Sequence, residues 1–327
     1  MDVLIDALRT ALGPQAALYA LAAVGLNLHY GYTGMLNFGQ VGFMLVGAYG
    51  IAIGVSTFGW PLWAALILTI VAAVGYALLL GLPTVRLRAD YLAITTLAAG
   101  EAMRLLFRSH STEEVTGGVF GLTRFANEFY ELNPIPRGRY GFGNLVFSHQ
   151  TLWVMIVGWV LAVAAALLVW RLAKSPWGRV ALSIREDEEV VRSAGKSVVS
   201  IKIQSLVLGG VMGAGAGAVL AISQQAVAPD AFIPEVTFFA YAAVILGGVG
   251  RAWGPLVGAV MFWFLISVFD SGIRALADTG AMPDQLFSAD ALGAYRFVLV
   301  GFGLMALMIF RPQGIFGDRN EMVLGDH

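Results

Sequence analysis

A dense run of charged side chains, which could take part in specific contacts, lies in one polar segment at 171–202 between two long apolar runs. Its charged residues follow one another: Arg185, Glu186, Asp187, Glu188 and Glu189. The periodicity of 180–194 predicts one amphipathic helix, with Val180, Ile184, Val191 and Ala194 on its apolar face, and Gly195 suits a C-terminal cap. Such a helix can dock in a groove of a soluble protein. Helices lying on lipid favour Lys and Arg, so four consecutive carboxylates favour a protein partner.

A second group of polar residues lies within an apolar run at 89–107. Glu101 and Arg104 are spaced so that they can pair on one helix face, and Thr95 and Thr96 precede them. Ionisable residues inside a membrane are costly and mark functional sites. The pattern leaves two interpretations open: a helix that lines a transport pathway, or a structural ion pair near the membrane surface.

Asn37 and Gln40 are lesser pathway candidates, because a role in helix packing or at a helix boundary explains such residues better. No motif predicts catalysis or metal binding: the four histidines are scattered and the chain has no cysteine. The sequence AGKS at 194–197 lacks the first glycine of a phosphate-binding loop and follows a predicted helix. We therefore expect no catalytic residue, metal or cofactor in this chain.

The composition predicts the elements that position these residues. Hydrophobic residues make up 58% and charged residues 13%, against about 25% charged in soluble domains. A net charge of −1 gives no basic patch for nucleic acid. A span needs about 20 apolar residues, and candidates occur at 14–31, 36–56, 61–82, 89–107, 150–171, 201–222, 236–250, 253–270 and 292–310. Those at 36–56 and 236–250 are short or broken by glycine.

The predicted fold is thus an all-α, polytopic transmembrane bundle of about eight to ten spans, some broken by glycine, forming one domain over 1–327. Glycines recur every fourth residue in two series: Gly209, Gly213, Gly217 and Gly250, Gly254, Gly258. Small residues at this spacing let helices approach closely in lipid. They indicate packing within the subunit or, alternatively, a moving or inter-subunit interface.

The basic residues indicate the orientation. Alternating spans place 173–200 and the C-terminus on the side with more Lys and Arg, which is the cytoplasmic side. The segment 108–149 then forms an external loop region.

Several stretches, in this order, resemble the M-type permease of bacterial branched-chain amino-acid ABC importers, the Liv or hydrophobic amino-acid uptake family. They are LPTVRLRADYLAITTLAAGEAMRLL at 82–106, TGG at 116–118, SPWGRVALSIREDEEVVRSAG at 175–195, PDAF at 229–232, VILGGVGRAWGPLVGA at 244–259 and YRFVLVGFGLMALMIFRPQGIFG at 295–317. Glu189 also stands six residues before Gly195, as in the coupling signature of importer permeases, although valines replace its two alanines.

This resemblance implies a subunit of the bacterial inner membrane that pairs with an H-type permease. Two cytoplasmic ATP-binding subunits would carry ATP and Mg and would receive the coupling segment 173–200. A solute-binding protein would dock from outside. Branched-chain amino acids are the expected substrates, with urea or short amides as the alternative.

An ion-coupled secondary transporter is the rival class. It would require carboxylates in the middle of spans, where Glu101 is nearly alone.

Overall fold

The computed structural model describes residues 2–142, 145–278, 298, 301–302 and 305. The long helices are α1 (Asp2–Leu12), α2 (Pro14–Asn27), α3 (Gln40–Ala52), α4 (Leu62–Thr84), α5 (Ala89–Arg108), α8 (His149–Lys174), α9 (Pro176–Glu186), α11 (Val198–Gln224), α12 (Pro234–Gly247) and α13 (Gly254–Asp278). Two π-helical segments, η1 (Leu28–Tyr32) and η2 (Ile53–Thr57), continue α2 and α3.

The connections contain only short elements. These are η3 (His110–Thr112), α6 (Glu113–Thr116), β1 (Leu122–Thr123), α7 (Asn127–Glu131), β2 (Arg139–Phe142), β3 (Leu145–Ser148), α10 (Glu188–Ser193), β4 (Ala226–Val227) and η4 (Pro229–Ala231). Two antiparallel pairs, β1 with β4 and β2 with β3, are the strand pairings of the described chain. The prediction of an all-α polytopic bundle is confirmed.

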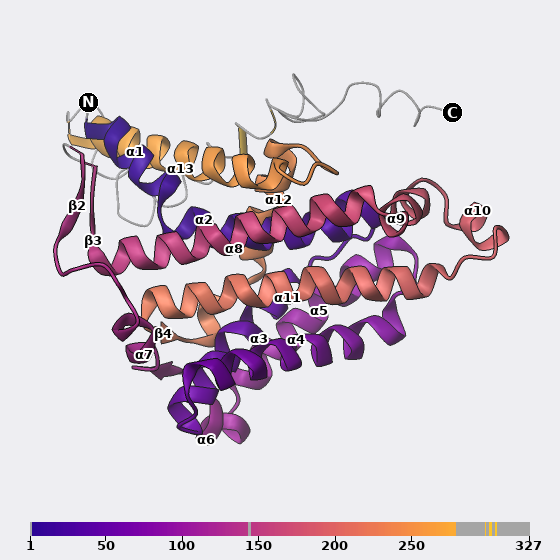
Figure 1. Ribbon diagram of the computed structural model, residues 1–327, viewed down its shortest axis with the longest axis horizontal. Helices are drawn as coiled ribbons and strands as arrows, with labels where there is room; N and C mark the ends of the chain where they lie inside the picture. Colours follow the sequence, from indigo (N-terminus) through magenta and orange to yellow (C-terminus); the bar gives the residue numbers. More distant parts are fainter. Residues whose placement is uncertain (1, 143–144, 279–297, 299–300, 303–304, 306–327) are drawn as a thin grey trace.

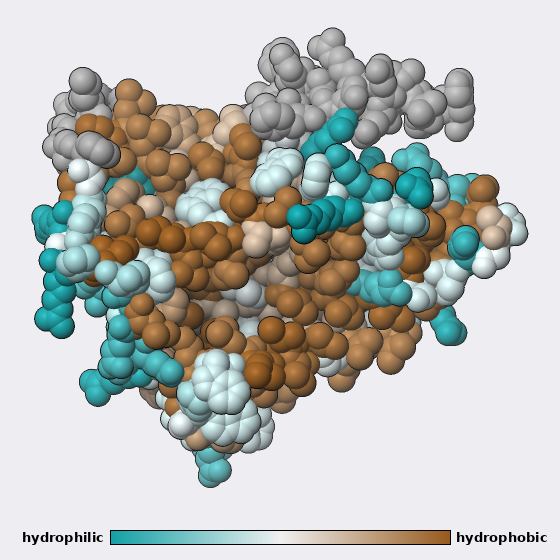
Figure 2. Space-filling view, in the orientation of Figure 1, coloured by the Kyte–Doolittle hydropathy of each residue, from teal (hydrophilic) through white to brown (hydrophobic). Residues whose placement is uncertain are grey.

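Six helices of the described chain are long and apolar enough to cross a membrane, or seven if the pair Val3–Leu12 and Pro14–Tyr32, bent by 45°, forms one span. This is fewer than the eight to ten expected. The helix α5 is not among the six despite its 20 residues, and the expected span at 292–310 falls almost entirely outside the described residues. Figure 2 shows apolar side chains over α4, α8 and α11.

The helices α3 and α11 form the centre of the bundle. In an apolar stretch of 18 residues from each, 78% of the residues are buried, against 39% in the corresponding stretch of α4 and 33% in that of α8. They pack closely because a β-carbon at Gly217 would lie 2.5 Å from the carbonyl carbon of Met44, which leaves room for glycine alone. The two unbroken helices α8 and α11 run the length of the bundle (Figure 1).

The two polar regions lie at opposite ends of these long helices (Figure 1). One end carries α9 and α10, and the other carries α6, α7 and the hairpin of β2 and β3. The region 108–149 is folded through its short helices and strand pairs.

Candidate functional site

The predicted single helix over 180–194 is wrong, because the chain breaks at Asp187. Ser175 begins α9 by accepting a hydrogen bond from the N–H of Gly178. At Asp187 the backbone is extended (φ −155°, ψ 110°), and its carboxylate accepts from the N–H groups of Glu189 and Val190. Asp187 is therefore the N-cap of α10, which ends the first helix and starts the second.

The apolar face of this segment is used inside the protein. Ile184 and Val191 are buried with Val198 of α11 in a small cluster. Ala194, which was expected on the same face, is exposed because it follows the last turn of α10. The surface left for a partner is therefore acidic.

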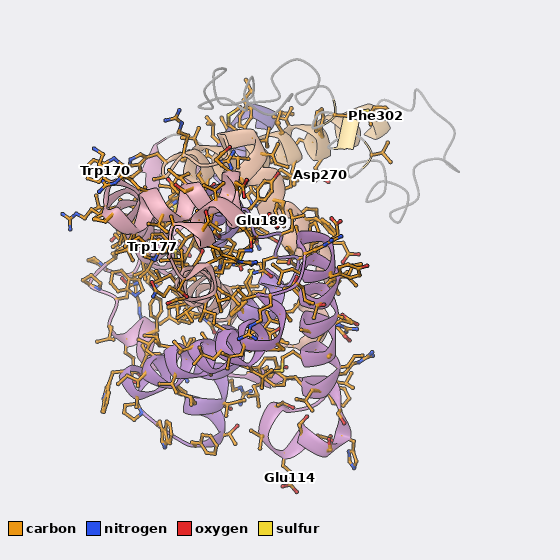
Figure 3. The ribbon with its side chains drawn as sticks, turned by 90° about the vertical axis from the view of Figure 1, so that its right-hand side faces the viewer. Glu114, Trp170, Trp177, Glu189, Asp270 and Phe302 are labelled. Carbon is orange, nitrogen blue, oxygen red and sulfur yellow. The ribbon has the colours of Figure 1, made fainter. Side chains whose placement is uncertain are left out.

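That outer surface has several carboxylates, the basic side chain of Arg192, which is 56% exposed, and one apolar side chain. Glu186, Asp187 and Glu189 are exposed, and Val190 is 62% exposed. Figure 3 views the molecule from this end and labels Glu189. Glu188 differs from the others: it pairs with Lys202, only 5% exposed on α11, and so fixes α10 to the bundle.

Glu101 and Arg104 form an ion pair on α5, and a third residue joins them. The guanidinium of Arg104 donates to both oxygens of Glu101, at 3.0 and 2.6 Å, and to Asp230 of η4 at 2.7 Å. Arg108 lies 3.6 Å from the same Asp230 carboxylate. Residue types and helical spacing could not single out Asp230, because it is 126 residues from Arg104.

The two threonines of α5 have separate roles. Thr95 is partly exposed and donates to the carbonyl of Tyr91. Thr96 is buried, and its hydroxyl accepts the N–H of Phe38 at 3.0 Å. Thr96 thus holds the non-helical stretch that joins the first span to α3.

Asn37 and Gln40 meet in a buried polar cluster, which we define as His29, Thr33, Asn37, Gln40 and Ser205. The amide of Asn37 donates to Nδ1 of His29 (3.1 Å) and to Gln40 Oε1 (3.3 Å). Nε2 of His29 lies 3.1 Å from the carbonyl of Ser205. All five residues are at most 1% exposed.

The hydrogen-bond geometry of this cluster determines the protonation state of the His29 imidazole. An amide NH₂ can only donate and a carbonyl can only accept, so the imidazole is neutral with its proton on Nε2. Both ring nitrogens are occupied, which leaves neither for a metal. Sequence inspection missed His29 because Ser205 is 176 residues away. No group of three or more His, Asp or Glu in the described residues could hold a metal ion.

The two glycine series are in different settings. Gly209, Gly213 and Gly217 lie on α11 against α2 and α3, and added β-carbons there would overlap His29, Gln40 and Met44. Gly250, by contrast, is in the turn before α13 with φ +76°, and only Gly254 and Gly258 belong to that helix. The second series is therefore not one helix face.

Known proteins share this sequence over almost its whole length. The family model "Branched-chain amino acid transport system / permease component" matches residues 11–309. The high-affinity branched-chain amino acid transport system permease protein LivM of Salmonella typhimurium is 30% identical over 91% of this chain and 67% of that protein.

Two further relatives carry the same name. LivM of Escherichia coli is 29% identical over 91% of this chain and 67% of its own length. A probable LivM of Methanocaldococcus jannaschii is 24% identical over 92% of this chain and 91% of its own length. This chain belongs to the family of branched-chain amino acid transport permeases, and it is a membrane permease subunit of an ABC importer.

Proposed function

We propose that this chain is the M-type half of a five-part importer of branched-chain amino acids in the bacterial inner membrane. An H-type permease would complete the pathway, and two cytoplasmic subunits would bind ATP and Mg. An extracytoplasmic solute-binding protein would deliver the substrate. The substrate class rests on the relatives named LivM, whose printed names specify branched-chain amino acids.

The observation that carries this proposal is the acidic outer surface of 186–190. Its apolar face packs inside the protein, so the carboxylates remain for a partner. This supports docking of an ATP-binding subunit rather than insertion into lipid, which would favour basic residues.

The arrangement of the polar ends supports the orientation. The end with α9 and α10 is also rich in basic residues, among them Arg171, Lys174, Arg179 and Lys196, which favours the cytoplasmic side. The opposite end, with 108–149, would then receive the solute-binding protein. We also propose a cytoplasmic C-terminus, which is what the alternation of the spans expected from the sequence implies.

The helix α5 is our candidate for the pathway. It is too polar to be counted among the apolar spans, yet one side of it is open, with Tyr91 62% and Ile94 65% exposed. Thr95 and Glu101 are partly exposed on this helix. A helix that carries both polar and exposed apolar side chains fits a surface that packs against the second permease. Glu101, paired with Arg104, offers little support for ion coupling.

The decisive experiment is to purify the chain from mildly solubilised native membranes and identify its partners by mass spectrometry. Two ATP-binding subunits and a second permease in defined stoichiometry are expected. Recovery of the chain alone would contradict the proposal. Uptake of radiolabelled leucine, compared with urea, then tests the substrate, and Glu189→Lys should lower recovery of the ATP-binding subunits.

A further inference from the structure

Arg185 differs from the acidic residues that follow it because it points into the bundle. Its side chain is 28% exposed, and Nη1 donates a hydrogen bond of 2.7 Å to the carbonyl oxygen of Gly31. These two residues are 154 positions apart. The end of α9 is therefore joined directly to the end of the first span.

The site that Arg185 binds is the C-terminal end of a helix. Gly31 lies in the π-helical segment η1, whose last carbonyls have no donors within the helix. A cation is also favoured there by the helix dipole. Gly34, with φ +68°, follows, and a β-carbon at this position would lie 3.3 Å from the Cα of Arg185. Glycine thus allows α9 to approach the chain where the first span ends.

A third segment, the turn between α12 and α13, meets them at the same point. The N–H of Gly250 donates to Asn27 Oδ1 at 2.9 Å, and Asn27 Nδ2 donates to the carbonyl of Arg251 at 3.0 Å. A β-carbon on Gly31 would lie 2.6 Å from the nitrogen of Gly250. We call the meeting of Arg185, Asn27, Gly31 and Gly250 the junction.

The junction continues into the buried polar cluster. Thr33, two residues after Gly31, donates to the carbonyl of His29 at 2.7 Å, and His29 contacts Asn37. A shift of the Gly31 carbonyl therefore acts on the helical turn that holds this cluster. A cleft of about 700 Å³, lined in part by Arg185 and Gly250, lies beside the junction.

We propose that Arg185 is a positioning residue that transmits movement of the coupling segment to the broken first span and to the turn before α13. The proposal rests on the proposed function, because the movement originates in the ATP-binding subunits. It assigns Arg185 to the inside of the permease rather than to the docking surface. Contiguous hydrogen-bonded networks of this kind can carry coupling between sites.

The test uses the full complex and a probe that does not depend on the substrate. Ala98→Cys, exposed on α5, introduces the only cysteine of this chain. Its rate of modification by a water-soluble thiol reagent is measured without nucleotide and with ATP and vanadate. The variants are Arg185→Ala, Arg185→Lys and the control Arg179→Ala, an exposed arginine of the same helix.

In Arg185→Ala we expect the nucleotide-dependent change in modification rate to fall about tenfold, the scale of one hydrogen bond to a charged group. Recovery of the ATP-binding subunits and their ATPase rate should remain within about twofold, because the acidic surface is intact. In Arg185→Lys the nucleotide-dependent change in modification rate should be partly retained, since lysine keeps the positive charge but lacks the planar guanidinium group. Arg179→Ala should behave as the parent.

Two results would overturn the inference. One is a parental response of Arg185→Ala in an intact complex, and the other is loss of subunit recovery by Arg185→Ala, which would place Arg185 on the docking surface. A parent chain that recovers no ATP-binding subunits would instead refute the proposed function, and the inference with it.

Discussion

Replacing Gly217 by alanine tests the close packing of α11 on α3 at the centre of the bundle. The new β-carbon would lie 2.5 Å from the carbonyl carbon of Met44 and 2.7 Å from its Cα. Carbon atoms pack at about 3.5 Å, so the two helices must separate by about 1 Å. The obstacle is backbone, which cannot rotate away as a side chain could.

The size of the effect follows from two opposing contributions. A gap of about 1 Å removes up to half of the dispersion energy of each contact that it opens. Overpacking of a core costs about 3 kcal/mol at the upper end of its usual range. Alanine returns about 1 kcal/mol through its better helix propensity. We expect a net destabilisation of about 2 kcal/mol.

Gly215→Ala is the matched control on the same helix. Its β-carbon would meet only the end of the Leu21 side chain, at 3.4 Å, so the propensity gain of about 1 kcal/mol should remain. The two variants should differ by about 3 kcal/mol, or about 4 °C in thermal midpoint for a chain of 327 residues.

The assay heats detergent-purified protein and follows the monodisperse fraction by size-exclusion chromatography with tryptophan fluorescence. A midpoint for Gly217→Ala equal to or above that of Gly215→Ala would refute the packing argument.

Three further variants test the polar sites. Gly195→Pro should abolish uptake of radiolabelled leucine without lowering the amount of protein in the membrane, because φ is +74° there and proline requires about −65°. Normal uptake would contradict the proposed coupling role of 173–200. Glu101→Gln should reduce uptake or thermal stability more than Gln225→Ala, a change at a polar residue that ends α11, because it removes a charge-assisted pair worth up to about 1 kcal/mol at this exposure. Equal effects would contradict a special role for the Glu101–Arg104 pair. Glu188→Gln leaves the buried ammonium of Lys202 with a neutral partner and should lower the free energy of unfolding by about 1–2 kcal/mol. An unchanged thermal midpoint would contradict this prediction.

Apolar length predicted the long helices well, because a span must fill the membrane. The expected ranges 61–82, 150–171 and 201–222 correspond to α4 at Leu62–Thr84, α8 at His149–Lys174 and α11 at Val198–Gln224. The break at Asp187 was missed because the apolar periodicity continues across it. Its signal was present: an aspartate followed by acidic residues is typical of a helix N-terminus.

The rest of the candidate site depends on contacts between distant parts of the chain. The sequence groups Arg185 with the charged residues that follow it, yet its bond to Gly31 follows only from the packing of α9 on the first span. In the same way, Asp230 and His29 belong to the candidate site through hydrogen bonds to partners more than 100 residues away. A single sequence records residue types and local spacing, and these pairings are set by tertiary packing.

The unbroken length of α11 has a consequence for the surrounding lipid. Its 27 residues span about 40 Å at 1.5 Å per residue, whereas the hydrocarbon layer is about 30 Å thick. An upright helix would therefore extend about 5 Å beyond the hydrocarbon layer at each end and place the acidic surface at the level of the headgroups, since the bilayer with its headgroups is about 40–45 Å thick. Thicker bilayers reduce this excess through hydrophobic mismatch and bring anionic headgroups toward the carboxylates. Acyl-chain length thus becomes a physical variable that sets how freely a soluble partner can reach this subunit.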